Sequence, residues 1–302
     1  MKGTNALSAQ TLPHLQVPKV IGMAVVAFTL VSCSAVSGPA ATAPPTGVQH
    51  AKVRTSDGDR SYRLFVPGGL RGSAPLLLVL QGCGPIRNGD DMADLTGLDK
   101  PAAADKFIAV YPDVLGPCWN ADGRHSTPDD VGFMKALLDK IGRTYAVDRN
   151  RVYATGISGG GFFTHMLGCR MADQLAAIAS VAGAVAVSDC KPSRPIPVLE
   201  LHGTADPAVP FAGIPDQGIP SVTKNMEQWA TLDGCGNPVQ SAAGIVTTTT
   251  WAGCGRGTKV ELMVVQGGQH VWYGSTCKPC AAVEVPGEPN ATSVVLSFLG
   301  LE

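Results

Sequence analysis

A serine flanked by glycines is the residue best placed to do chemistry in this sequence. Ser158 stands in Gly156-Ile157-Ser158-Gly159-Gly160, at the end of the expected strand Val152–Gly156 and before a helical stretch. Small residues two positions before and after a serine permit the strained strand-to-helix turn of a nucleophile elbow, which exposes the hydroxyl. A glycine-rich turn or a phosphate-cradling loop is the alternative, although the Gly-Lys-Ser/Thr ending of a phosphate loop is missing. We therefore predict that Ser158 is a nucleophile.

A serine hydroxyl is a weak nucleophile at neutral pH and needs a general base, which a carboxylate in turn orients. Folds with a nucleophile elbow supply these groups in the chain order serine, acid, histidine. Three histidines follow the serine: His165 in the next helix, His202 at the end of a strand, and His270 in a loop after another strand. His165 is expected to be a packed or hydrogen-bonded helix residue, and His202 is expected to tie the turn that follows its strand. His270 is the predicted base, with a surface-loop histidine as the alternative. Asp206, just past the strand that His202 closes, is the predicted acid.

The negative oxygen of a tetrahedral intermediate needs two backbone N–H donors. Gly159, the residue after the nucleophile, is expected to supply one of them. The second donor is expected in the loop after the apolar run Leu76–Gln81, where Gly82-Cys83-Gly84 follows. We assign it to the amide of Cys83.

Short apolar runs alternate with helical stretches over the part of the chain that must position these residues. The expected strands are Lys52–Thr55, Tyr62–Pro67, Leu76–Gln81, Phe107–Tyr111, Val152–Gly156, Ile178–Val181, Val198–His202 and Val260–Val265. Helices are expected at about 91–105, 128–146, 160–173, 220–232 and 290–300, with Thr127 as the N-cap of the second. Several strands are continuous apolar runs, which is typical of a parallel sheet covered on both faces. The alternation predicts a single α/β domain over residues 49–302, with a mostly parallel central sheet flanked by helices and its site at the carboxyl ends of the strands.

The composition excludes several classes of protein. The chain has 302 residues, of which 45% are hydrophobic and 16% charged, at a formal net charge of −1. This apolar fraction is too high and the net charge too small for a disordered protein. Nucleic acid is not expected as a partner either, because no basic stripe is present to meet a phosphate backbone.

The N-terminal segment predicts export. The apolar run Val20–Ser32 is too short to span a bilayer and is typical of a signal peptide, predicted over residues 1–32. Leu30-Val31-Ser32-Cys33 resembles the lipobox of bacterial lipoproteins, so Cys33 is predicted to be lipidated and to anchor the protein at the extracytoplasmic face of the membrane. An ordinary secretory signal cleaved near Ala35 or Ala40 is the alternative. Residues 33–48, rich in Pro, Ala and Ser, are predicted to be a linker.

Seven motifs that follow one another along residues 50–300 resemble the polyhydroxybutyrate-depolymerase-like esterases, a group that includes feruloyl and acetylxylan esterases. They are Gln81-Gly-Cys-Gly84, Tyr111-Pro-Asp113, Cys118-Trp119-Asn120, Asp129-Asp-Val-Gly-Phe133, Gly156-Ile-Ser-Gly-Gly160, His202-Gly-Thr-Ala-Asp-Pro207 and Gly268-Gln-His-Val-Trp272. The resemblance implies an α/β-hydrolase fold, secretion, and ester hydrolysis through an acyl-enzyme without a cofactor. The family's serine, acid and histidine fall on Ser158, Asp206 and His270.

The motifs depart from the family pattern at the rim of the expected pocket. Gln81 stands where the family usually has histidine, Gly159 where asparagine often follows the nucleophile, and Tyr273 where proline is usual. These changes concern the choice of substrate more than catalysis. Trp119 and Trp272 are candidates for lining a substrate subsite, and packing for burial is the alternative.

The chain contains nine cysteines, an unusual number for a reducing compartment. With Cys33 set aside for lipid, eight remain, and sequence alone allows 105 pairings. The resemblance implies Cys83–Cys118, and the order along the chain gives the hypothesis Cys169–Cys190, Cys235–Cys254 and Cys277–Cys280. The lone C-x-x-C at 277–280 has no second Cys/His pair, which favours a disulfide over a metal or redox site.

Together these features predict an exported, lipid-anchored serine esterase. We expect a monomer that acts on small-molecule or polymeric carboxylic esters and holds no metal. An envelope acyltransferase with the same three residues and a non-catalytic binding lipoprotein on a hydrolase scaffold are the alternatives.

Overall fold

The structure is a computed structural model that describes residues 44–84, 86, 88–122, 128–186, 189–275, 277 and 285–302. The predicted signal segment 1–32 and the predicted lipidation residue Cys33 lie outside these residues. The first strand, β1 (Gly47–Thr55), begins two residues inside the predicted linker. The Pro45 carbonyl accepts a hydrogen bond from the Tyr145 hydroxyl at 3.1 Å, so the chain is attached to the folded domain from Pro45 onward.

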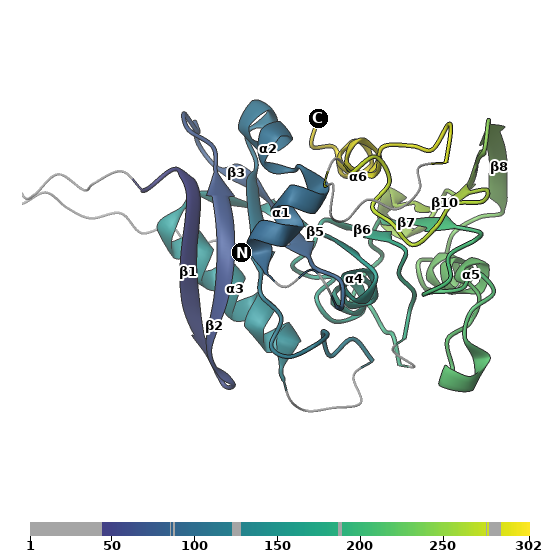
Figure 1. Cartoon of the computed structure of the whole chain (residues 1–302), viewed down its shortest axis with the longest axis horizontal. Coiled ribbons are helices and arrows are strands. Elements are labelled where there is room, and N and C mark those ends of the chain that lie inside the picture. Colours follow the sequence, from purple (N-terminus) through teal and green to yellow (C-terminus); the bar gives the residue numbers. More distant parts are fainter. Residues whose placement is uncertain are drawn as a thin grey trace, which may run out of the picture. The chain divides into compact units, whose positions relative to one another are not determined.

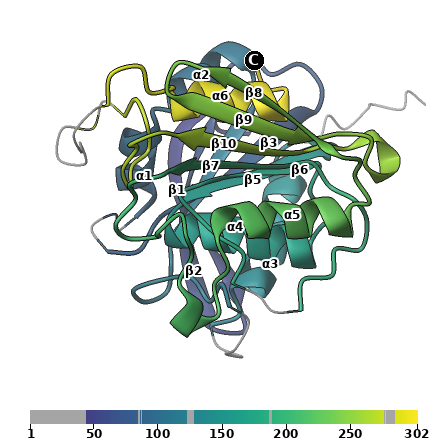
Figure 2. The same cartoon turned by 90° about the vertical axis from the view of Figure 1, so that its right-hand side faces the viewer.

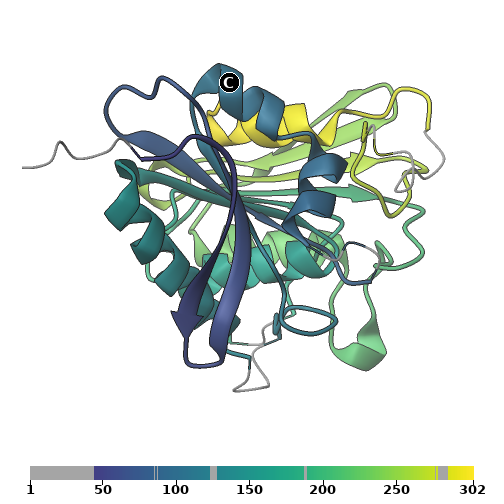
Figure 3. The same ribbon diagram turned by 60° about the vertical axis from the view of Figure 1, so that its left-hand side comes forward.

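Ten strands of the described chain form one continuous sheet in the order β1-β2-β4-β3-β5-β6-β7-β10-β9-β8. Figure 1 shows β1 and β2 at the left of the sheet and β8 at the right. The stretch from β4 to β10 is parallel, and antiparallel strands complete both edges. Figure 3 shows β1 and β2, the purple strands, at one edge. The strands after β1 are β2 (Gly58–Val66), β3 (Ala74–Leu80), β4 (Ile108–Pro112), β5 (Val147–Ile157), β6 (Ala177–Val181), β7 (Val198–Gly203), β8 (Pro238–Ala243), β9 (Val246–Trp251) and β10 (Val260–Val265).

Helices cover both faces of this sheet (Figure 2). The helices are α1 (Gly89–Thr96), α2 (Asp99–Asp105), α3 (Asp130–Thr144), α4 (Gly159–Arg170), α5 (Val222–Leu232) and α6 (Ala291–Leu299). Side chains of α3, α4 and α5 pack into one core layer, and those of α1, α2 and α6 pack into the other. Along β3, Leu76 and Leu78 face the first layer while Leu77 and Val79 face the second, because successive side chains of a strand point to opposite faces. This doubly covered sheet explains the continuous apolar runs of the sequence.

All eight expected strands and all five expected helical stretches are present, with differences at their ends and in three details. The stretch at about 91–105 is two helices, because Gly97 ends α1 in a left-handed conformation at φ 63°. The predicted N-cap was wrong: Asp129, not Thr127, caps α3, its carboxylate accepting the Gly132 amide at 2.8 Å, and Thr127 lies outside the described residues. The hairpin of β8 and β9 was not expected, since β8 is exposed along its whole length and β9 carries the polar run Thr247–Thr250.

Three predicted cysteine pairs form disulfides in the structure: Cys83–Cys118, Cys169–Cys190 and Cys235–Cys254. Cys277 is also disulfide-bonded, and the partner predicted for it, Cys280, lies outside the described residues. In the part of the chain that is described, no helix is long and apolar enough to cross a membrane.

Candidate active site

Ser158 occupies a sharp turn between β5 and α4. Its backbone has φ 57° and ψ −124°, a conformation that strains a residue with a side chain and is expected of a nucleophile elbow. A Cβ on Gly160 would lie 2.1 Å from the Leu80 carbonyl oxygen, and one on Gly156 would lie 2.6 Å from the carbonyl oxygen of Gly160. Only glycine therefore fits on either side of this turn. The Ser158 amide donates to the Val181 carbonyl at 3.0 Å, which ties the turn to β6.

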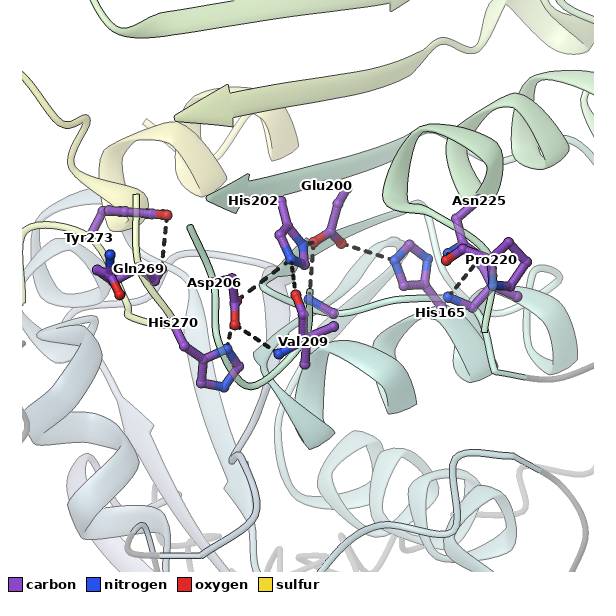
Figure 4. Close-up of polar contacts among 12 residues, drawn as sticks. His165, Glu200, His202, Asp206, Val209, Pro220, Asn225, Gln269, His270 and Tyr273 are labelled. Atoms are coloured by element: carbon purple, nitrogen blue, oxygen red, sulfur yellow. Dashed lines mark hydrogen bonds and ion pairs between the residues drawn. The ribbon is translucent and has the colours of Figure 1, made fainter. Parts of the chain in front are cut away.

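Asp206 and His270 come from loops that follow the neighbouring strands β7 and β10, and they are hydrogen-bonded (Figure 4). The Nδ1 atom of His270 lies 2.7 Å from Oδ2 of Asp206, and Oδ1 accepts the amides of Ala208 and Val209 at 2.9 and 2.8 Å. The carboxylate has no exposed surface, and these three donors replace the water that it loses. With Nδ1–H directed at the acid, Nε2 of His270 is left free to accept a proton.

Backbone contacts hold these two loops against each other. The Ala205 amide donates to the Gly268 carbonyl at 3.0 Å, and the Gly267 amide donates to Oγ1 of Thr204 at 2.8 Å. Gly203 also packs on this carbonyl, since a Cβ there would lie 2.1 Å from the oxygen of Gly268. The separation of acid and base is therefore set by the main chain as well as by their side chains.

Ser158 lies between two cavities. Ser158 and His270 both line the smaller one, of about 370 Å³, together with Asp94 and Leu95 of α1. The larger one, of about 640 Å³, is lined by Ser158 and by Gly159 and residues of several loops. Among the described residues, Ser158 makes no side-chain hydrogen bond to His270, a bond that in catalytic sites is often long and tightens only with substrate.

Cys83 and Gly159, the predicted oxyanion donors, pack against each other beside the serine. A Cβ on Gly159 would lie 2.3 Å from Sγ and 3.3 Å from the backbone nitrogen of Cys83. The disulfide to Cys118 holds this loop. The indole N–H of the next residue, Trp119, donates to the Gln81 carbonyl at 2.8 Å, so both a covalent bond and a buried hydrogen bond restrain the loop after β3.

Trp119 and Trp272 each line one of the cavities, but both are packed into the protein. Trp119 is 5% exposed and stacks on Phe163 with the ring centroids 4.9 Å apart. Trp272 is 2% exposed and donates its indole N–H to Oγ1 of Thr292 at 2.9 Å. Each tryptophan therefore contributes only a small part of its ring to a cavity wall.

A buried polar cluster lies beside Asp206, on the side away from His270 (Figure 4). Glu200 on β7 is 1% exposed, and its carboxylate lies 3.0 Å from Nε2 of His165, 2.9 Å from Nδ1 of His202 and 3.0 Å from the Gly183 amide. Burial alone raises the pKa of Glu200, but the hydrogen bonds from His165 and His202 outweigh it and lower the pKa to about 2. Burial lowers the pKa of His202, whereas the hydrogen bond and charge of Glu200 outweigh it and raise it.

The sequence reasoning missed Glu200. The available signal was an acid within the apolar strand Val198–Gly203, because a buried carboxylate requires partners. His202 and His165 were expected to tie a turn and to be a packed or hydrogen-bonded helix residue, respectively. His202 does contact the following turn, with Nε2 lying 2.9 Å from the Val209 carbonyl oxygen, and His165 is 1% exposed and hydrogen-bonded.

Several relatives of this chain are named as esterases. No family model matches the chain, but the "Putative esterase NocK" of Nocardia uniformis subsp. tsuyamanensis is 31% identical over 248 residues, which are 72% of this chain and 72% of that protein. The chain belongs to this esterase family. Feruloyl esterase B of Piromyces equi is 31% identical to the esterase over 227 residues, 68% of the chain and 41% of that relative. The esterase thus spans less than half the length of this second relative.

The solved structures confirm the predicted α/β-hydrolase fold. An acetyl xylan esterase from Aspergillus awamori matches with a TM-score of 0.62 at 15% identity, over 84% of this chain and 100% of that one. A dienelactone hydrolase-like structure from Klebsiella pneumoniae matches with a TM-score of 0.54 at 16% identity, over 84% and 99%. The relatives at 31% identity identify the chain as a carboxylic ester hydrolase, and the solved structures show its fold.

Proposed function

We propose that the esterase cleaves its substrates through a Ser-His-Asp triad and an acyl-enzyme. His270 takes the proton of Ser158 as the oxygen attacks the ester carbonyl, while Asp206 orients the imidazole. The amides of Gly159 and Cys83 stabilise the negative oxygen of the tetrahedral intermediate. The protonated His270 then gives its proton to the departing alcohol, and water attacks the acyl-enzyme by the same route to release the acid and restore the serine hydroxyl.

One observation carries this proposal: the strained serine and the imidazole line one cavity, and a buried carboxylate bonds the imidazole at 2.7 Å. The two cavities beside the serine, of about 370 and 640 Å³, offer space for a substituent on each side of the ester. The relatives named as feruloyl esterases and the motifs of the sequence favour feruloyl, acetyl-sugar and hydroxybutyrate esters as substrate classes.

Labelling with a fluorophosphonate, which reacts with activated serines, tests the triad. We expect the wild type to be labelled and the Ser158→Ala variant to lose both labelling and ester hydrolysis. Ser180→Ala is the matched control, because this serine is fully buried and its hydroxyl has no hydrogen-bond partner in the structure. An unlabelled wild type, or equal labelling of Ser158→Ala, would contradict the mechanism. Values of kcat/KM for short-chain acyl, feruloyl, acetyl-sugar and hydroxybutyrate esters then rank the substrate classes.

We also propose that residues 1–32 direct export, that Cys33 carries the lipid, and that residues 33–48 link it to a catalytic domain at 49–302. Three disulfides support an oxidising compartment. Labelled fatty acid should be incorporated into the wild type and not into Cys33→Ala, and incorporation into both would refute lipidation at this cysteine. Sedimentation of the domain tests the expected monomer.

A further inference from the structure

The proton positions in the buried cluster follow from its donors and acceptors. The indole N–H of Trp229 can only donate, and it lies 3.1 Å from Nδ1 of His165. This ring nitrogen is therefore an acceptor, and the proton of the His165 ring resides on Nε2. From there it is donated to Oε2 of Glu200 at 3.0 Å.

His202 faces acceptors on both sides. Its Nε2 lies 2.9 Å from the carbonyl oxygen of Val209, which cannot donate. Its Nδ1 lies 2.9 Å from Oε1 of Glu200, an oxygen that also accepts the Gly183 amide at 3.0 Å. With Glu200 ionised, both ring nitrogens of His202 must carry a proton, so this pair is a buried imidazolium and carboxylate. The lowered pKa of Glu200 and the raised pKa of His202 both favour this charged pair.

This imidazolium lies against the proposed catalytic acid. Nε2 of His202 is 3.6 Å from Oδ2 of Asp206, and the same oxygen accepts Nδ1 of His270 at 2.7 Å. Figure 4 shows the Asp206 carboxylate between the two imidazoles. Neither His202 nor Asp206 exposes any side-chain surface, so solvent ions screen their attraction little.

We propose that His202, held as a buried imidazolium by Glu200, is a positioning residue that offsets the charge of Asp206 and so sets the pH range in which His270 acts as the base. The inference rests on the triad proposed above. A general base must be unprotonated to accept the serine proton. A buried carboxylate beside it favours the protonated imidazole, and a second cation on that carboxylate opposes this effect.

The titratable groups that interact with His202, or with one of its two neighbouring carboxylates, come from four parts of the fold. Glu200 precedes it on β7, Asp206 follows it in the next loop, His165 reaches the cluster from α4, and Tyr273 lies in the loop after β10. Burial, and then the charge of Asp206, raises the pKa of Tyr273, so its hydroxyl stays neutral. Glu200 and Asp206 are therefore the charges that His202 meets.

The pH dependence of kcat/KM in two matched variants tests the inference. His202→Gln removes the positive charge and keeps an N–H donor that can reach Val209. His165→Gln makes the same substitution at a neutral imidazole that is equally buried and bonded to the same Glu200, but does not contact Asp206. We expect the acidic limb of the His202→Gln profile to move to higher pH by about one unit, because His270 then keeps its proton at a higher pH. The limb of His165→Gln should stay within about 0.3 unit of wild type.

An unchanged limb in His202→Gln, or an equal shift in both variants, overturns the inference. If the variant does not fold, ¹⁵N NMR of the wild-type imidazoles provides the second test. We expect both nitrogens of His202 to be protonated at pH 7.5, and a neutral ring there refutes the proposal. Failure of the triad itself gives a different result, since Ser158→Ala would then remain active whatever the charge of His202.

Discussion

Removal of the Cys83–Cys118 disulfide should reduce catalysis by more than its effect on stability explains. This bond closes 35 residues of chain, and the Cys235–Cys254 bond closes 19. The loop-entropy relation gives contributions to the free energy of unfolding of about 4 and about 3 kcal/mol, respectively. The two bonds therefore stabilise the fold to similar extents, but only the first includes a proposed oxyanion donor.

The double variants Cys83→Ala/Cys118→Ala and Cys235→Ala/Cys254→Ala separate the two effects. Without its disulfide, the Cys83 amide is no longer held beside Gly159, and a displacement of about 1 Å from a productive geometry costs up to about 100-fold in rate. We expect kcat/KM of the first variant to fall by about 10- to 100-fold, mainly through kcat, because the contact forms in the transition state. The second variant should stay within about threefold of wild type.

Urea unfolding provides the stability of each variant, and the kinetics are measured well below both melting temperatures. Wild-type kcat/KM in the Cys83→Ala/Cys118→Ala protein would refute the role of the disulfide in holding the oxyanion loop. An equal loss of kcat/KM in both variants would attribute the effect to general loosening of the fold.

Two further predictions concern a buried acid and the turn around the serine. Asp233 is 2% exposed, one carboxylate oxygen accepts the Ile196 amide at 3.1 Å and the other has no partner, and burial raises its pKa to about 6. The pKa of Asp233 in the folded protein exceeds its pKa in the unfolded chain, so the stabilisation present below about pH 4 is lost as the pH rises through about 6. In urea titrations the free energy of unfolding of Asp233→Asn should therefore exceed that of the wild type by up to about 3 kcal/mol at pH 8 and nearly equal it at pH 4. A variant that is no more stable than the wild type at pH 8 contradicts this. Gly160→Ala would place a Cβ 2.1 Å from the Leu80 carbonyl oxygen, whereas Gly168→Ala on the same helix would meet only side chains, the end of Ile178 at 2.6 Å and the Trp229 ring at 3.0 Å. Hydrolysis assays should therefore show at least about a 100-fold loss in the first variant and less than about a fivefold loss in the second. Comparable activities would show that the elbow tolerates a Cβ.

The strands of the central sheet could be predicted because a strand that is buried on both faces is a continuous run of apolar residues. Runs such as Leu76–Gln81 and Val260–Val265 contain almost no polar residue, and they coincide with β3 and β10 to within two residues. The edge hairpin could not be predicted in the same way. Thr247–Thr250 in β9 is only partly buried and β8 is exposed, so backbone pairing rather than an apolar face defines these strands.

The candidate site was predictable where chain order and local motifs specify it. The elbow glycines and the order serine, acid, histidine selected the residues that the structure places at the ends of β5, β7 and β10. The role of Glu200 could be seen only in the folded structure, because its partners His165 and Gly183 lie 35 and 17 residues away along the chain. The sequence motif contains His202 and Asp206 four residues apart, but it does not show that the carboxylate of Glu200 keeps His202 charged.

The strain at Ser158 explains why the surrounding loops are restrained so strongly. A non-glycine residue in an unfavourable backbone conformation costs about 1–3 kcal/mol and persists only where its neighbours leave no alternative. Here those neighbours are the backbone contacts of Gly156 and Gly160 within the elbow and the Cys83 loop packed against Gly159. On the opposite side, the Glu200 cluster contacts the acid through His202, whose Nε2 lies 3.6 Å from Oδ2 of Asp206. Loosening either side should let the serine relax before the fold is lost, so activity should fall at lower denaturant concentrations than the global unfolding signal. Coincident transitions in activity and circular dichroism would show instead that the strained turn and the sheet unfold as one unit.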